Sequence, residues 1–211
     1  NLANPDEGYD GGQSIIRSEK RGARATFNTA IDFDGVEATF IYGIDALKDT
    51  TSQPLVDGRV WVPEMEMDSL AGFLQTKWVI HDDLIVKAGV RRESIDLSVD
   101  DYETLKLCRS ETQCSVPLQV KGDTIDYDAT TYNIAIKYNW SDSFSPFFNY
   151  SQGSDIADIG RLLRAATVDD IGLIQTEASI IDNYEVGFTS LFDQVRLEVA
   201  AYRSTSELGT T

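Results

Sequence analysis

Apolar and polar residues alternate along most of the chain with a period of two. In the segment 132–140, Tyr, Ile, Ile, Tyr and Trp occupy every second position, and polar or small residues such as Lys137 lie between them. Successive side chains of a β-strand point to opposite faces, so this pattern predicts strands with one apolar and one polar face. Helical periodicity is nearly absent, and we therefore expect an all-β protein.

The same alternation recurs in seven further segments and predicts about eight strands in total. These strands are expected at 23–32, 36–45, 69–80, 84–93, 132–140, 144–152, 184–189 and 195–202. Short connections fall around 32–35, 81–83, 141–143 and 192–194, and long ones span 48–66, 98–126 and 153–182. Short periplasmic turns and long extracellular loops are typical of an antiparallel transmembrane β-barrel, whose strands span a bilayer with about 9–11 residues.

Two other folds share this alternation. A soluble antiparallel sandwich would use the apolar face as a packed core, but it would not explain the alternation of short and long connections. Nor would it explain why Trp78, Tyr138 and Trp140 lie near the short turns, where a barrel has an aromatic girdle. A passive barrel closed by eight strands alone is an open alternative.

Composition and charge narrow the range of functions expected for this protein. The chain has 211 residues and a net charge of −17, with a hydrophobic fraction of 42%, so we expect a folded protein without affinity for nucleic acid. No stretch of 18 apolar residues predicts a transmembrane helix. The sequence has no nucleophile motif and no phosphate-binding glycine loop, and its single histidine, His81, lies in a predicted turn. An enzyme is therefore not expected.

Cys108 and Cys114 lie close together in a polar stretch. Zinc binding is disfavoured because His81, the one histidine, is distant in sequence. A small disulfide between the two cysteines is the better interpretation, and it indicates an oxidising compartment.

Five segments, in their order and spacing, resemble TonB-dependent receptors. They are 86–91 (VKAGVR), 148–153 (FNYSQG), 156–160 (IADIG), 182–188 (DNYEVGF) and 195–202 (VRLEVAAY). The resemblance implies a 22-stranded barrel around an N-terminal plug domain in the outer membrane of a Gram-negative bacterium. Residues 1–211 are then expected to be part of the barrel domain, about eight strands of the probable 22, with the plug and the closing strands absent.

The resemblance also implies a cargo and partners. The segments 156–160 and 182–188 are most similar to siderophore receptors of the aerobactin type, so a ferric siderophore is the expected transported ligand, without a resident cofactor. Cobalamin, a metal chelate or a glycan are alternative cargoes. Expected partners are TonB, through the absent N-terminal region, the protein's own plug domain, and lipopolysaccharide with other outer-membrane lipid.

Charged residues of both signs alternate with the apolar positions and should face the barrel lumen. Those expected to face the plug are Arg24, Lys77, Lys87, Arg91, Lys137, Glu185 and Arg196. The alternative is ion pairing among the wall residues themselves.

The long loops contain the candidate ligand contacts. Arg161 and Arg164 would share a face if their segment is helical, and two guanidinium groups suit an anionic ferric chelate. They could instead be solvated and paired with nearby aspartates. The acidic residues of 98–126 are expected to form a solvated rim that divalent ions bridge to lipopolysaccharide. Calcium binding there is a weaker hypothesis because the segment lacks EF-hand spacing, and we predict no metal site.

Overall fold

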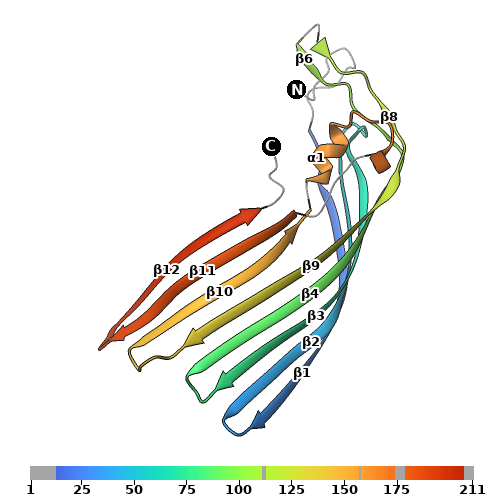
Figure 1. The fold of residues 1–211 in the computed structure, drawn as a ribbon. Helices are drawn as coiled ribbons and strands as arrows, with labels where there is room; N and C mark the ends of the chain where they lie inside the picture. Colours follow the sequence, from blue (N-terminus) through green and yellow to red (C-terminus); the bar gives the residue numbers. More distant parts are fainter. Residues whose placement is uncertain (1–12, 111–112, 157, 174–178, 207–211) are drawn as a thin grey trace.

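The computed structural model describes residues 13–110, 113–156, 158–173 and 179–206. Eight long strands form one antiparallel sheet in which the spatial order follows the sequence (Figure 1). The strands are β1 (Arg17–Phe33), β2 (Val36–Pro54), β3 (Val60–Ile80), β4 (Leu84–Val99), β9 (Asp123–Tyr138), β10 (Phe144–Asp155), β11 (Ser179–Phe192) and β12 (Val195–Ser206). The prediction of an all-β antiparallel fold with eight strands is confirmed.

The two longest connections contain small elements of their own. Between β4 and β9, β5 (Tyr102–Glu103) pairs with β8 (Gln119–Val120), and β6 (Cys108–Ser110) pairs with β7 (Gln113–Cys114). Between β10 and β11 lie the short helix α1 (Ile159–Arg164) and the 3₁₀ turn η2 (Ile171–Leu173). All of these elements lie at one end of the sheet (Figure 1).

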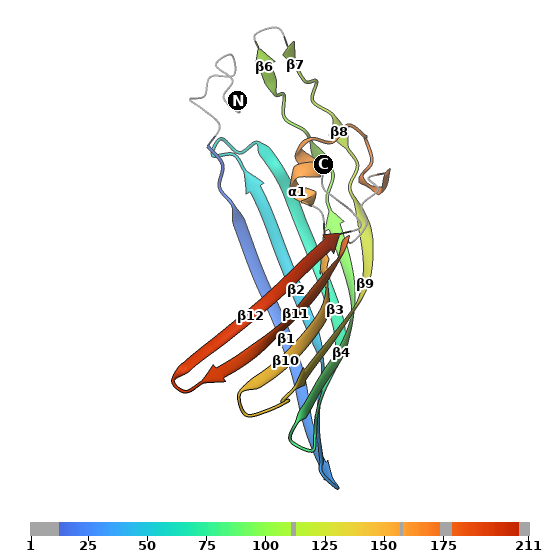
Figure 2. The same cartoon turned by 60° about the vertical axis from the view of Figure 1, so that its left-hand side comes forward.

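The sheet is a curved, open wall (Figures 1 and 2). Its edge strands β1 and β12 each pair with one neighbour only, and they do not pair with each other within the described ranges. These strands therefore do not close on themselves, and the alternative of an eight-stranded barrel is wrong for this part of the chain.

Tight turns join the strands at the opposite end. Asp34 and Gly35 both have positive φ angles, of 42° and 80°, which is the conformation of a two-residue hairpin turn that favours an Asp-Gly sequence. His81, Asp82 and Asp193 adopt positive φ angles in two further turns. The short connections are thus at the predicted places.

One predicted long loop is wrong. Segment 48–66 was expected to be irregular, but β2 continues to Pro54 and β3 begins at Val60. The reason is a change of polarity along the strands. In β4, Leu84, Val86, Ala88 and Val90 share one face, which we call the outer face.

Beyond Val90 the two faces exchange their character. The outer positions become polar, with Arg92, Ser94 and Asp96, while Ile95, Leu97 and Val99 make the inner face apolar. The same exchange occurs in β3, where Met65 and Met67 point inward and Glu66 and Asp68 point outward, and in β9. Beyond Val90 the strands therefore continue with their polar outer face exposed to water and their apolar inner face buried.

The apolar outer face has the dimensions of a membrane band. In β3 it extends from Leu70 to Ile80, which is about 33 Å of strand, or about 25 Å of height at a tilt near 40°. Its side chains are exposed, with Ile136 at 38% and Trp140 at 72% of their surface accessible. Nothing among the described residues packs against this face as the second layer of a sandwich would.

Candidate functional site

The inner face of the wall is the candidate functional surface. Strand pairing places all seven charged residues that were predicted to face a plug on this one face: Arg24, Lys77, Lys87, Arg91, Lys137, Glu185 and Arg196. The face has three levels: a lysine-lined hollow toward the tight turns, an ion-pair network above it, and a cap of folded loops at the far end.

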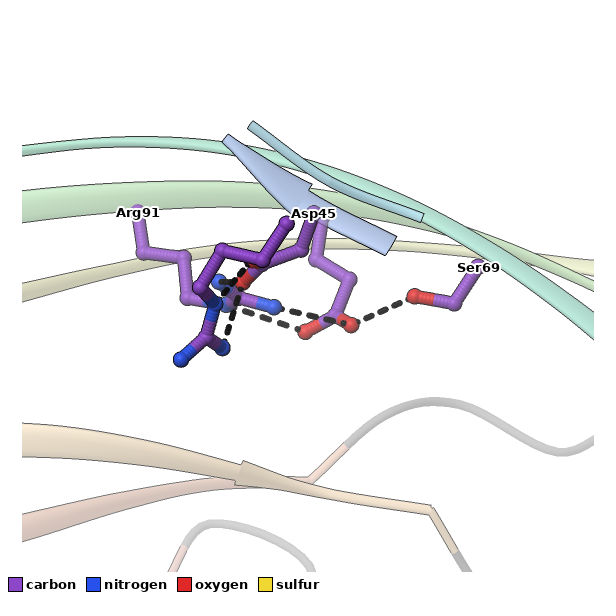
Figure 3. A network of polar contacts seen from close by, with 5 residues as sticks. Asp45, Ser69 and Arg91 are labelled. Carbon is purple, nitrogen blue, oxygen red and sulfur yellow. Dashed lines mark hydrogen bonds and ion pairs between the residues drawn. The ribbon is translucent and has the colours of Figure 1, made fainter. Parts of the chain in front are cut away.

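The ion-pair network joins β1, β2, β3 and β4 near the middle of these strands, and Figure 3 shows its residues Asp45, Ser69 and Arg91. Asp45 is 9% exposed and accepts hydrogen bonds from Arg24 Nη2 at 2.9 Å and from Arg91 Nη1 at 2.6 Å. The Arg91 Nη2 atom lies 3.3 Å from Glu93 Oε1, which also accepts from Ser69 Oγ at 2.6 Å. Two arginines balance two carboxylates, so this network is neutral and internally satisfied.

The lower part of the inner face is a hollow of about 440 Å³. Lys77, Lys87 and Lys137 line it from one side, while Glu185 and Arg196 line it from β11 and β12. All three lysines are exposed, and none forms an ion pair among the described residues. The lumen charges therefore divide into a satisfied group and an unsatisfied one, which the sequence did not distinguish.

The cap covers the upper part of the inner face. Helix α1 and turn η2 bury Leu163 and Ile171 completely against inward side chains of the wall, including Leu97 and Val99. The Tyr102 hydroxyl donates to the Leu163 carbonyl at 2.8 Å, and burial raises the pKa of Tyr102 to about 12. The loops thus fold inward and are packed against the wall.

A second set of contacts ties the two long loops to each other. The Lys121 N–H donates to the Asp169 carbonyl at 2.8 Å, the Ile171 N–H donates to the Lys121 carbonyl at 3.2 Å, and the Lys121 ammonium lies 3.2 Å from Asp170. The Gly172 N–H and then Lys121 hold the pKa of Asp170 below its usual value. Because the pKa of Asp170 is lower in the folded protein, its charged carboxylate stabilises the contact at pH values above the pKa that Asp170 has in the unfolded chain. This stabilisation is lost as the pH falls through the lowered pKa.

The two predicted ligand-contact arginines lie on α1, so the helical segment is confirmed. Asp158 caps the helix by accepting from the Arg161 N–H at 3.0 Å. The Arg161 side chain is exposed, whereas Arg164 is half-buried with its guanidinium 5.5 Å from the centre of the Trp61 ring. Trp61 was missed because it lies in the segment that was expected to be a loop. Whether either arginine contacts a ligand stays a prediction.

The cysteine positions are opposite each other in the β6–β7 ladder, where Cys108 pairs with Cys114. This backbone arrangement is compatible with the predicted disulfide, which stays a prediction.

We expect non-reduced peptides from the protein isolated from the outer membrane to contain a Cys108–Cys114 link. Such a short ring should order the loop tip and leave the barrel strands largely unaffected. Mass spectrometry with and without reduction measures the link, and free thiols at both positions before reduction would contradict the prediction.

Asp101, one of the acidic residues of the 98–126 connection, has a local structural role. Asp101 accepts from the Gly122 N–H at 2.7 Å, and a side chain at Gly122 would lie 2.2 Å from the Val99 carbonyl oxygen. Within the described ranges, no group of His, Cys, Asp and Glu residues is arranged to hold a metal ion, so the calcium hypothesis gains no support. No described helix is long and apolar enough to cross a membrane.

The fold and the site define a class of protein: a curved antiparallel wall with an apolar, lipid-type outer face, a polar inner face and loops folded over one end. The model of the family "TonB dependent receptor-like, beta-barrel" matches residues 2–207. The chain therefore belongs to the β-barrel of the TonB-dependent receptors, an outer-membrane family of transport receptors and not of enzymes.

Two curated receptors are similar to this chain in sequence, and both are much longer proteins. The ferric aerobactin receptor of Klebsiella pneumoniae is 23% identical over 167 residues, which is 69% of this chain and 22% of that protein. The rhizobactin receptor of Rhizobium meliloti (strain 1021) is 24% identical over 162 residues, covering 69% of this chain and 21% of that receptor. The chain thus spans about a fifth of the curated relatives it matches.

Solved structures share the fold. The hemophore receptor HasR of Serratia marcescens, solved as a double mutant with its hemophore HasA and heme, superposes with a TM-score of 0.70 at 15% identity. The match covers 92% of this chain and 34% of that one. At this identity the likeness establishes the architecture of the wall and not the cargo.

Proposed function

We propose that this chain is part of the wall of a Gram-negative outer-membrane receptor that takes up a ferric siderophore with energy from TonB. The observation that carries the proposal is the similarity to two receptors named for aerobactin and rhizobactin, each over 69% of this chain. No resident cofactor is proposed, and the ferric chelate is the transported ligand. TonB would act through an N-terminal region outside this chain, and a plug domain would occupy the lumen.

The outer face supports the proposed lipid environment. Large apolar side chains such as Ile134 and Val186 are exposed there without a protein partner among the described residues. Lipopolysaccharide is the lipid that we propose for the outer leaflet, beside the polar continuation of the strands.

The α1 loop is the proposed contact with the chelate. It lies on the inner face at the end away from the tight turns, where cargo would enter (Figure 2). Arg161 presents an exposed guanidinium group there. The Arg164 guanidinium lies over the Trp61 ring, 5.5 Å from its centre, and a cation–π contact of this kind leaves N–H donors free to bind a ligand.

We expect Arg161→Ala with Arg164→Ala to weaken ferric-siderophore binding by the full receptor. A charge-assisted hydrogen bond contributes about 1.5–3 kcal/mol, so losing one arginine contact should raise Kd roughly ten- to hundredfold. A binding titration with a hydroxamate–carboxylate ferric chelate measures the change, and a heat-modifiability gel shows that the variant has folded.

Arg92→Ala is the matched control, because Arg92 is an exposed arginine on the outer face. Unchanged affinity in the folded double variant would remove Arg161 and Arg164 from the site. If no hydroxamate, catecholate or carboxylate chelate bound the wild-type receptor at roughly micromolar concentration, a typical weak-binding range, the cargo assignment itself would be wrong.

A further inference from the structure

A second hollow, of about 250 Å³, lies between the start of the α1 loop and the upper inner face of the wall. Its apolar lining consists of five side chains: Met65, Met67, Leu97, Ile156 and Ile159. The rest of the lining is formed by Asp49, Thr51, Asp158 and Gly160. We call this space the cap hollow, because the cap of folded loops forms one of its sides.

The polar groups that line the cap hollow have partners within the chain. Asp49 lies 2.8 Å from the Lys20 ammonium and accepts from the Thr51 hydroxyl at 3.1 Å. Asp158 accepts from the Arg161 N–H at 3.0 Å. Because these groups already hold partners, a polar occupant would gain little from them. The apolar lining, in contrast, gains from any occupant that removes it from water.

The two methionines make the lining adaptable. The sequence contains only two methionines, and both line the cap hollow from the inner face of β3. Both are half-buried, at the edge of the packed core of the cap. A methionine side chain is unbranched and can change rotamer to follow the shape of an apolar partner. The lining therefore suits a flexible apolar group better than one of fixed shape.

The size of the cap hollow indicates that it holds part of a ligand. Sites that enclose a whole small molecule have volumes of about 300–1,000 Å³, which is larger than this hollow. An apolar cavity of about 150 Å³ is large enough for benzene, so about 250 Å³ accommodates a chain of roughly eight to ten carbon atoms. These dimensions are those of a linear acyl or alkyl substituent.

A cation follows the cap hollow directly in the sequence of α1. Asp158, Ile159 and Gly160 line the hollow, and the next residue, Arg161, is exposed. An apolar chain in the hollow would therefore bring an attached anionic group close to this helix, which also carries Arg164. Both features lie at the end of the wall where cargo would enter (Figure 2). Together they fit an amphiphile that is anionic at one end and apolar at the other.

We propose that the cap hollow binds the linear apolar chain of an amphiphilic ferric chelate, whose anionic iron-binding part lies at Arg161 and Arg164. The inference rests on the proposed function, because it names the class of chelate that the same loop would select. The cap hollow contributes selectivity. A chelate without such a chain leaves the hollow to water, whereas a chelate with a chain gains affinity by burying it.

A homologous series of chelates tests the proposal on the full receptor. The probes are ferric hydroxamate–carboxylate chelates with linear acyl chains of about 2 to 12 carbons, which bracket the size of the hollow. Kd should fall roughly two- to fourfold for each added methylene, since a fully buried methylene contributes about fourfold and the hollow is partly open to solvent. The fall should end at about eight to ten carbons, where the hollow is full.

Two substitutions at one position distinguish the cap hollow from detergent or lipid as the site of the chain. Met67→Gln nearly keeps the side-chain size but places an amide in the lining. The affinity of the ten-carbon chelate relative to the two-carbon chelate should then fall roughly fivefold. Met67→Leu is the matched control, because it keeps the lining apolar at nearly the same volume and should preserve that ratio. Partition of the chelates into detergent is the same for all three proteins and cancels from the comparison.

Equal affinities across the series, with the two-carbon chelate bound by the wild-type receptor, would overturn the inference and leave the proposed function in place. A gain with chain length that Met67→Gln does not reduce would put the chain outside the cap hollow and would also overturn the inference. If no chelate of the series bound, the cargo itself would be wrong and the inference would fall with it.

Discussion

An arginine at Ile136, or at its neighbour Ile134, is expected to destabilise the folded receptor in a bilayer by about 2–4 kcal/mol, the cost of placing that charge near the midplane on the lipid face of a barrel. Ile136 is exposed on the outer face between Val86 of β4 and Phe148 of β10, so an arginine there has no polar partner on this wall. Denaturant titration of the receptor refolded into lipid vesicles measures the loss.

Ala135→Arg is the matched control, one residue away on the inner face. It places the same side chain in the water-accessible hollow, directly opposite Lys87. The like-charge contact should cost up to about 1 kcal/mol, which is still well below the cost at Ile136. Equal losses on the two faces would contradict the assignment of the outer face to lipid.

Leu163→Ala is expected to loosen the cap by about 2–5 kcal/mol. Leu163 is fully buried between α1 and the wall, and truncating a buried leucine removes its apolar contacts and leaves a cavity. The loss should fall on the docking of the loops, since this cluster lies beyond the membrane band. Hydrogen exchange followed by mass spectrometry should show faster exchange of the backbone amides in α1 and η2, with the strands unchanged.

Leu162→Ala distinguishes packing from helix propensity. Leu162 occupies the adjacent position in α1 but is 37% exposed, so its truncation should cost about 1 kcal/mol or less. If both variants opened the loops equally, the packing of α1 against the wall would not be what holds the cap.

The sequence predicts the strands well wherever the lipid-facing side of the segment is apolar along its whole length. The alternation at 132–140 placed the end of β9 and its tight turn, although β9 begins earlier, at Asp123. The Asp34–Gly35 hairpin follows from turn chemistry alone. The error at 48–66 has a specific cause: Met65 and Met67 lie on the opposite face from Leu70 and Leu74. A strand predicted from one continuous apolar face stops where the two faces exchange their polarity, although the β-strand itself continues.

The site could be predicted only as a set of residues. Alternation places Arg24, Lys87 and Arg91 on one face, but which charges pair depends on how the strands are aligned across distances of up to 46 residues, as for Arg91 and Asp45. The inward folding of the loops was equally inaccessible, because Leu163 and Ile171 meet the wall only through tertiary packing. No local pattern links Arg164 to Trp61.

The exchange of polarity along β3, β4 and β9 also determines how deeply the wall is immersed. If the whole wall moved in the bilayer by the length of two residues, about 7 Å along a strand, every side chain would stay on its own face and every strand pair would be kept. Strand pairing alone therefore cannot prevent such a movement. Sliding toward the tight-turn end would draw Arg92 and Asp96 into hydrocarbon and push Leu84 out of it, and sliding the other way would lift Val90 into water. The boundaries of the apolar outer face therefore fix the depth of the wall in the membrane, and a bilayer of different thickness would have to deform to match them.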